Sequence, residues 1–169
     1  LDIGEAQSAR NAYEVALESE PEPLDRCRAL IGLAACDRQL GDIDRALACL
    51  AAAEPMAAAD GAAPLLAEIS YLRGNLHFAR GSAGECLAAH TAALAAAQRA
   101  GQPEWLARAE SGLGDAHYLQ GRYALAQQHF RRSVDTAEAA GLLRILPPNR
   151  GMIGNCHIFY CRFDAGLLD

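Results

Sequence analysis

Residues 101–140 read GQPEWLARAESGLGDAHYLQGRYALAQQHFRRSVDTAEAA, and the landmarks of this stretch return at intervals of 40 residues. Moving toward the N-terminus, Gly114 falls on Gly74 and Gly121 falls on Gly81. Self-similarity at a fixed period is the signature of a repeat array, in which each unit packs mainly on its neighbours. The stretch is therefore one structural unit, and it predicts a protein whose function is to bind another molecule.

The composition favours an all-α protein. Hydrophobic residues make up 51% of the 169 residues, but aromatic residues make up only 6%, and alanine dominates. Small apolar residues suit closely packed helices better than a sheet, which is usually rich in valine and isoleucine. We therefore predict an all-α repeat fold built from helix pairs.

Glycine and proline divide the chain into these pairs. Glycine ends helices in the left-handed conformation, and proline is tolerated in the first turn of the helix that follows. We expect a single repeat domain over 1–169, with the second helix of a broken repeat in 1–20, full repeats in 21–60, 61–100 and 101–140, and an incomplete repeat in 141–169. The expected helices cover Asp2–Glu18, Leu24–Leu40, Asp42–Ala59, Leu65–Arg80, Ala83–Ala100, Glu104–Gln120 and Arg122–Ala140.

The fourth unit is irregular. Pro147 and Pro148 stand inside the expected first turns of its helix, so that helix should start later, near Pro148. Cys161 replaces the turn glycine and Gly166 replaces the packing alanine, which leaves the last turn and helix open. Neither end carries the polar cap that closes a repeat array, so we expect the chain to be part of a longer protein.

The charge balance excludes several classes of function. The net charge is -6, whereas nucleic-acid and anionic-membrane binders rely on basic surfaces, so neither partner is expected. The sequence has no lysine, which excludes the Gly-Lys-Ser/Thr phosphate loop and a Schiff-base lysine from these residues. No convergent acid, base or nucleophile set is visible, so we expect neither catalysis nor a cofactor here.

The cysteines favour a reducing environment. None is separated from another by the two residues typical of zinc and redox pairs, although their even number leaves a disulfide framework formally open. In alanine-rich helices a cysteine behaves as a small buried apolar residue, which favours the cytoplasm. The sequence opens without a signal peptide, and its longest apolar run, Ala46–Ala53, is far shorter than the ~20 residues of a membrane span. The six cysteines are Cys27, Cys36, Cys49, Cys86, Cys156 and Cys161.

The run LGDAHYLQGRY over residues 113–123, with Ala126 and Phe130, resembles a tetratricopeptide repeat in its longer variety of about 40 residues. The physical logic agrees, because Gly114 lets two helices approach closely, Ala126 faces that contact and Phe130 fills the space beside it. The resemblance implies a right-handed α-α superhelix, a solenoid of antiparallel helix pairs. It also implies a non-catalytic scaffold for a protein or peptide segment.

Four shorter stretches are similar to the C-terminal repeat regions of large bacterial signalling proteins. In that family a nucleotide-cyclase module and an ATPase module precede the repeats, so the resemblance implies a sensory or docking arm that binds a partner or other domains of its own chain. A free-standing peptide-binding adaptor is the alternative, and a small all-α enzyme is the least favoured. The stretches are residues 26–34, 73–78, 86–90 and 112–116.

Three histidines, His77, His117 and His157, recur at one repeat position. A metal ladder is disfavoured because neighbouring helices lie 8 to 10 Å apart, whereas zinc binds its ligands at about 2.1 Å. The family usually has a tyrosine packed between helices at this position. We therefore expect structural, hydrogen-bonded histidines and no metal site.

The resemblance also implies a partner-binding face. In tetratricopeptide arrays the first helices of the pairs line a concave surface, and aromatic and arginine side chains on such a surface suit a protein partner. Arg28, Arg108 and the aromatic residues favour an acidic or C-terminal peptide. The alternative for Phe78 and Tyr118 is that they fill the next helix interface. The predicted concave-face residues are Arg28, Arg38, Glu68, Tyr71, Asn75, Phe78, Arg108, Ser111, Asp115, Tyr118, Asn155 and Ile158.

Overall fold

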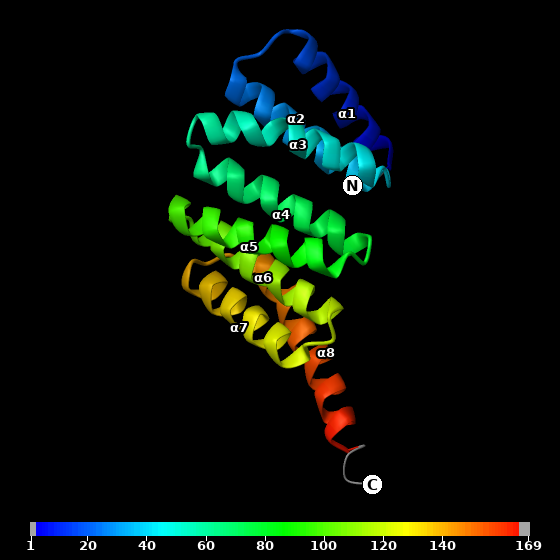
Figure 1. Cartoon of the computed structure of the whole chain (residues 1–169), viewed down its shortest axis with the longest axis vertical. Coiled ribbons are helices and arrows are strands. Elements are labelled where there is room, and N and C mark those ends of the chain that lie inside the picture. The colour runs from blue at the N-terminus through cyan, green and yellow to red at the C-terminus, as the bar shows by residue number, and fades with distance from the viewer. Residues whose placement is uncertain (1–2, 166–169) are drawn as a thin grey trace.

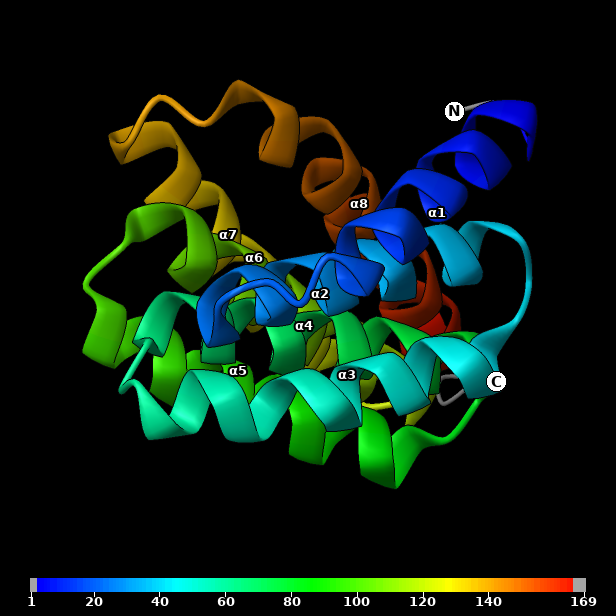
Figure 2. The same cartoon turned by 90° about the horizontal axis from the view of Figure 1, so that it is seen from above.

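A computed structural model describes the backbone of residues 3–165 and the side chains of residues 3–159. Within these residues every regular element is helical, and consecutive helices stack along the long axis of the molecule (Figures 1 and 2). The predicted all-α solenoid of helix pairs is therefore confirmed. The elements are α1 (Ile3–Glu18), α2 (Pro23–Gln39), α3 (Ile43–Ala59), α4 (Ala63–Ala79), α5 (Ala83–Ala100), α6 (Pro103–Leu119), α7 (Tyr123–Ala139), the 3-10 turn η1 (Leu143–Ile145) and α8 (Leu146–Ala165).

Glycine makes six of the helix connections. The φ angles of these glycines lie between 63° and 83°, a region that residues with a Cβ seldom adopt. The connection between α1 and α2 has no glycine and places Glu20 at a φ of 49° instead. The six glycines are Gly41, Gly61, Gly81, Gly101, Gly121 and Gly141.

The fourth unit begins differently from the others. After Gly141 the chain first forms η1, and α8 then starts at Leu146, two residues before the predicted start at Pro148. Pro147 and Pro148 fit there because the first turn of a helix does not need their missing N–H groups. The helix packs on α7 and scarcely contacts α6, whereas α4 packs directly on α6. The first helices of the last two units are therefore separated.

The structure has no turn at Cys161, where the sequence left the last turn open. The backbone of α8 continues through Cys161 to Ala165 without a turn at Cys161. A cysteine does not impose the left-handed conformation that ends the other helices at glycine, so nothing local interrupts the helix. Gly166 and the side chain of Cys161 lie outside the residues that the structure describes.

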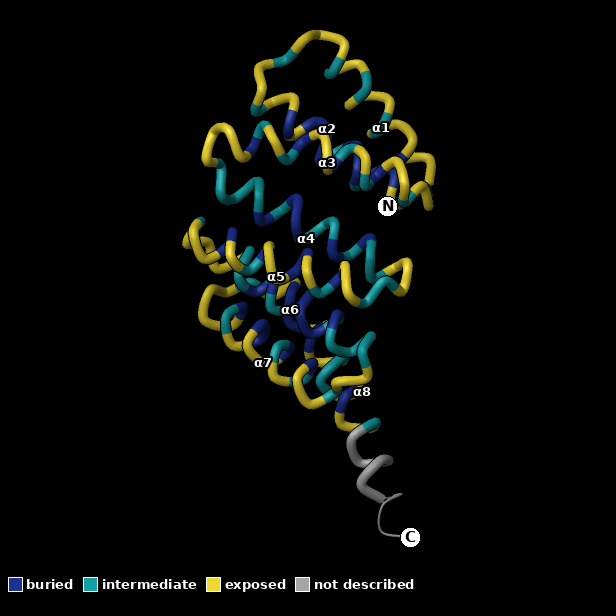
Figure 3. Tube along the Cα trace, in the orientation of Figure 1, coloured by how far each residue is buried: buried dark blue, intermediate teal, exposed yellow. Residues whose placement is uncertain are grey.

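The predicted close contact between α6 and α7 is present. Phe130 is 1% exposed, and a Cβ atom added to Gly114 would lie 2.5 Å from its ring. Ala126 beside it is fully buried. Figure 3 shows buried residues along the seam between neighbouring helices, as a solenoid requires. At Gly154, one repeat further on, no described atom outside the local backbone of α8 lies within 4 Å of the equivalent position.

His90 takes the place of Phe130 in the preceding repeat. It is 0% exposed and lies between Gly74 of α4 and Gly112 of α6, where a Cβ on either glycine would overlap its ring. Neither ring nitrogen has a hydrogen-bond partner within the described residues. Burial, and to a smaller extent the nearby His77, lowers the pKa of His90 to about 4. The core of this repeat thus contains a neutral, unpaired histidine.

The described cysteines behave mainly as small core residues. Cys27, Cys36, Cys86 and Cys156 are buried free thiols, which confirms the prediction for these four, and Cys49 is half-buried. Burial raises the pKa of each of these thiols, that of Cys86 to about 11. Among residues 3–165 no helix is long and apolar enough to span a membrane.

A buried carboxylate fastens α1 to the first full pair. Asp37 is 1% exposed, and one of its oxygens accepts a hydrogen bond from Nε of Arg10 on α1 at 3.0 Å. Arg45 of α3 lies 3.3 Å from the other oxygen. Burial raises the pKa of Asp37, while the charge of Arg10 and its hydrogen bond act in the opposite direction. Asp37 lies 40 residues before His77 and therefore occupies the same repeat position.

Replacing Arg10 by alanine is expected to lower the free energy of unfolding by about 1 kcal/mol, because the buried charge of Asp37 would lose one of its two arginine partners. Arg28→Ala is the matched control, since Arg28 forms an exposed pair with Asp25 on the same helix at 2.8 Å. That pair should contribute at most about 0.5 kcal/mol. Urea unfolding of the two variants measures the difference, and equal losses would contradict the anchoring role of Arg10.

Candidate functional site

An aromatic and arginine cluster spans α4 and α6. Tyr71 and Trp105 meet edge to face with their ring centroids 6.2 Å apart. The Cζ atom of Arg108 lies 5.9 Å from the Tyr71 ring and 5.6 Å from the Trp105 ring, within the range of cation–π attraction. Glu104, one turn earlier on α6, accepts hydrogen bonds from Nε and Nη2 of Arg108 at 3.0 and 2.8 Å. These contacts hold the guanidinium in one orientation.

Two cavities lie beside this cluster, where α6 faces η1 and the start of α8. One has a volume of about 260 Å³ and the other about 390 Å³, and Arg108, Arg144 and Ile145 line both. We call the two together the α6–α8 cleft. The first cavity is also lined by Tyr71, Ser111, Pro148 and Asn149, and the second by Glu104, Gly141, Leu142 and Leu143.

Asn149 and Arg144, which line the cleft, have polar groups without partners among residues 3–159. Asn149 is 2% exposed, and its Nδ2 donates to the carbonyl oxygen of Ile145 at 2.8 Å, which leaves Oδ1 without a hydrogen bond. Arg144 is exposed and forms no ion pair with the described residues. Asn149 and the exposed Arg144 therefore line the same cavity.

Two carboxyl groups on the same helices are costly to ionise. Burial raises the pKa of Glu68 on α4, although the charge of Arg108 lowers it. Burial raises the pKa of Asp115 on α6 to about 7, and no ion pair of Asp115 occurs within the described part of the chain. Near neutral pH, Asp115 is therefore partly protonated, and no cation of the described residues is paired with its charged form.

The structure gathers only some of the predicted face residues. Tyr71, Arg108 and Ser111 line one cavity, and Glu68 is close enough to Arg108 to interact with its charge. The half-buried residues Asn75, Phe78, Asp115 and Tyr118 lie on the same two helices but do not line this cavity. Tyr118 packs edge to face against Tyr123 and Phe159, so it also fills a helix interface, as the alternative reading of this residue expected.

The remaining predicted residues lie apart from this group. Arg28 is bound to Asp25 on the surface of α2, and Arg38 is exposed on the same helix. α2 makes few contacts with α4, so these arginines do not reach the cleft. Asn155 and Ile158 are exposed on α8.

Trp105, Arg144 and Asn149 were missed as site residues. The available signal for Trp105 was its place three residues before Arg108, on the same side of the expected helix. Arg144 and Asn149 flank Pro147 and Pro148, so their positions depend on where α8 starts, and the 40-residue period does not give that start.

The three repeated histidines have different surroundings. His117 stacks on His129 with the ring centroids 5.2 Å apart and interacts with the side chain of Gln120, while its Nδ1 has no hydrogen-bond partner within the described residues. His129 in turn pairs with Glu110 at 2.7 Å. His77 is half-buried, and burial lowers the pKa of both His77 and His117.

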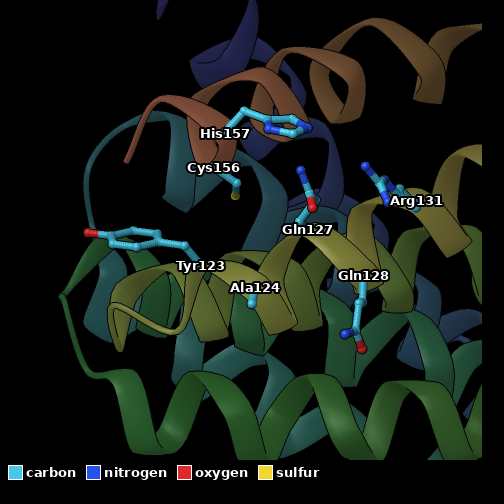
Figure 4. A pocket seen from close by; sticks show the side chains of 7 residues that line it. All are labelled: Tyr123, Ala124, Gln127, Gln128, Arg131, Cys156 and His157. Atoms are coloured by element: carbon cyan, nitrogen blue, oxygen red, sulfur yellow. The ribbon is translucent and has the colours of Figure 1, made fainter. Parts of the chain in front are cut away.

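His157 is exposed instead of packed, which corrects the prediction for that position. It borders a cavity of about 320 Å³ between α7 and α8, with Cys156 on its own helix and Tyr123, Gln127 and Arg131 among the residues of α7 (Figure 4). In the complete repeats the second helix of the pair packs on the first helix at this histidine position, as α7 does at His117 of α6. Within residues 3–159, no second helix covers this position in the fourth unit.

Residues 65–139, which span most of α4 and all of α5 to α7, match the family model of the tetratricopeptide repeat. This stretch is an array of tetratricopeptide repeats. The family supplies protein-binding scaffolds and is generally non-catalytic. No curated protein matches the sequence. The predicted resemblance is thus confirmed at the level of the repeat, and the α6–α8 cleft lies where the matched tetratricopeptide repeats adjoin the irregular fourth unit.

Proposed function

We propose that the chain is a non-catalytic scaffold that binds an extended protein segment along the concave face of its first helices, α2, α4, α6 and the start of α8. The observation that carries this proposal is the cluster of Tyr71, Trp105 and Arg108 beside an open cavity. Aromatic rings provide contact area with few rotatable bonds, and arginine provides several donors at once. This combination is typical of residues that dominate protein interfaces.

We further propose that the scaffold is the sensory or docking arm of a larger cytoplasmic signalling protein of the cyclase or ATPase kind. The similarity of residues 73–78 and 112–116 to repeat regions of such proteins supports this proposal. Immunoblotting of the source cell with an antibody to this chain tests it. A band far heavier than 17.9 kDa supports the larger protein, and a band near that mass favours the free-standing adaptor.

Selection of a random peptide library on the purified protein, followed by affinity measurement, tests the binding face. Arg108→Glu is expected to weaken the selected peptides at least ~10-fold, because a charge-assisted hydrogen bond would be replaced by repulsion. Tyr71→Ala is expected to weaken them as well.

The matched control is Arg99→Glu, which makes the same charge change at an exposed position on α5. Its affinity should stay within about 2-fold of the unmodified protein, because exposed charges away from an interface have small effects. Equal effects of the two substitutions would argue against the proposed face, and so would unchanged affinity in Arg108→Glu.

A further inference from the structure

The α6–α8 cleft has two chemically different halves. On one side of the arginines lie the hydroxyl groups of Tyr71 and Ser111 and the amide of Asn149. On the other side lie Leu142 and Leu143, and Leu143 is 73% exposed. An occupant that fills both halves must pass between Arg108 and Arg144.

The charges of the cleft favour an anion at this crossing point. Its lining contains two guanidinium groups and one carboxylate, that of Glu104, which is already bound to Arg108. Arg144 has no ion pair within the described residues, so its donors are free for a ligand. Guanidinium groups bind carboxylates through paired, charge-assisted hydrogen bonds.

The polar half offers hydrogen-bonding side chains to an occupant. Tyr71, Ser111 and Asn149 line it, and hydroxyl groups both donate and accept hydrogen bonds. The N–H and C=O groups of a peptide backbone fit such a lining, whereas inorganic phosphate would leave the apolar half empty. The cleft thus combines a cationic crossing point, polar side chains and an exposed apolar surface.

We propose, building on the proposed function, that the α6–α8 cleft recognises an acidic side chain within an extended segment. Its carboxylate lies between Arg108 and Arg144, neighbouring backbone groups form hydrogen bonds with the hydroxyl groups of Tyr71 and Ser111, and an adjacent apolar side chain covers Leu142 and Leu143. A terminal carboxylate would end the segment at the arginines and leave one half of the cleft unfilled. The internal acidic residue therefore fits better.

The fluorescence of Trp105, the single tryptophan of the chain, reports on this site because its ring lies 5.6 Å from Cζ of Arg108. Three acetylated tetrapeptides serve as probes: Ala-Glu-Leu-Ala amide, Ala-Gln-Leu-Ala amide, and Ala-Gln-Leu-Ala with a free terminal carboxylate. The glutamate peptide is expected to bind at least ~10-fold more tightly than either glutamine peptide, which corresponds to one charge-assisted contact. Stronger binding of the free-carboxylate peptide would overturn the internal position.

Variants at exposed positions keep the test independent of folding. Arg144→Gln is expected to weaken the glutamate peptide at least ~10-fold, and Leu143→Ser several-fold. Arg132→Gln, at an exposed position on α7, is the matched control and should leave the affinity unchanged. Inorganic phosphate at equal ionic strength should neither change Trp105 fluorescence nor compete, and competition would overturn peptide recognition in favour of a general anion site.

The outcomes separate this inference from the proposed function. If selected library peptides bind through Tyr71 and Arg108 but are insensitive to Arg144→Gln and Leu143→Ser, the cleft assignment fails and the scaffold proposal stands. If no library peptide and no tetrapeptide binds, both fail.

Discussion

Replacement of Gly114 by valine is expected to lower the free energy of unfolding by about 3 kcal/mol, near the upper end for overpacked helix contacts. The position of the added Cβ is 2.5 Å from the Phe130 ring, closer than two carbon atoms can approach. Phe130 cannot turn away, because it is 1% exposed and is held in a cluster with Ala126 and Cys156. The helices α6 and α7 must therefore separate to accept the side chain.

Gly154→Val is the matched control for this substitution. Gly154 is the same repeat position on α8, and among the described residues no atom outside the local backbone of α8 lies within 4 Å of its added Cβ. Valine has a somewhat better helix propensity than glycine, so this variant should be neutral or gain a few tenths of a kcal/mol. Thermal unfolding compares the two, and a difference of this size amounts to several degrees in Tm for a domain of this length. Similar melting temperatures would contradict the packing described for α6 and α7.

Much of the fold could be predicted from the sequence because it depends on local signals that recur. The glycines at 20-residue spacing require left-handed turns, and the structure has one at each of them. The equivalence of Gly114 and Gly74 marks helices that approach closely, and the same alignment carries Phe130 onto His90. The spacing of the repeats therefore indicated that His90 is a core position, although histidine is not a typical core residue.

The candidate site was less predictable because it depends on departures from the period. Tyr71, Arg108 and Ser111 follow from the repeat position of the first helices, and they do lie together. Arg144 and Asn149 belong to a segment where η1 and two prolines displace the start of α8, and no other unit provides a template for this segment. The buried Asp37 was also missed, since its partner Arg10 is 27 residues away on α1.

Opposite pH dependences are expected for variants of two desolvated groups, the buried His90 and the half-buried Asp115. The pKa of His90 is lowered from its ordinary 6.5 to about 4, so between these values the unfolded chain binds a proton that the native protein does not. The contribution of His90 is therefore lost as pH falls from 6.5 to 4, by about 3 kcal/mol over the whole interval. The pKa of Asp115 is raised from 3.8 to about 7, so the native protein binds the extra proton, and its contribution rises as pH falls from 7 toward 4.

These two contributions largely oppose each other in the unmodified protein. Removing one group should reveal the pH dependence that the other gives to the free energy of unfolding. Urea unfolding between pH 4.5 and 8 measures this dependence. Asp115→Asn is expected to stabilise the protein by about 2 kcal/mol at pH 8, since it removes a costly charge, and this gain should vanish near pH 4.5. His90→Leu, which introduces the residue present at Leu50 in the first full repeat, should become more stable relative to the unmodified protein as pH falls.

Differences between each variant and the unmodified protein isolate these two groups. His117, Glu68 and Asp37 also have shifted pKa values, but none of these shifts depends on His90 or Asp115, so their contributions cancel in the difference. His77 acts on the pKa of His90, so the difference for His90→Leu includes this coupling. A double variant should show the sum of the two single differences, because the pKa of neither group depends on the charge of the other. If the single variants instead follow the unmodified protein in parallel across this range, His90 is not held neutral in the core and Asp115 is not desolvated on α6.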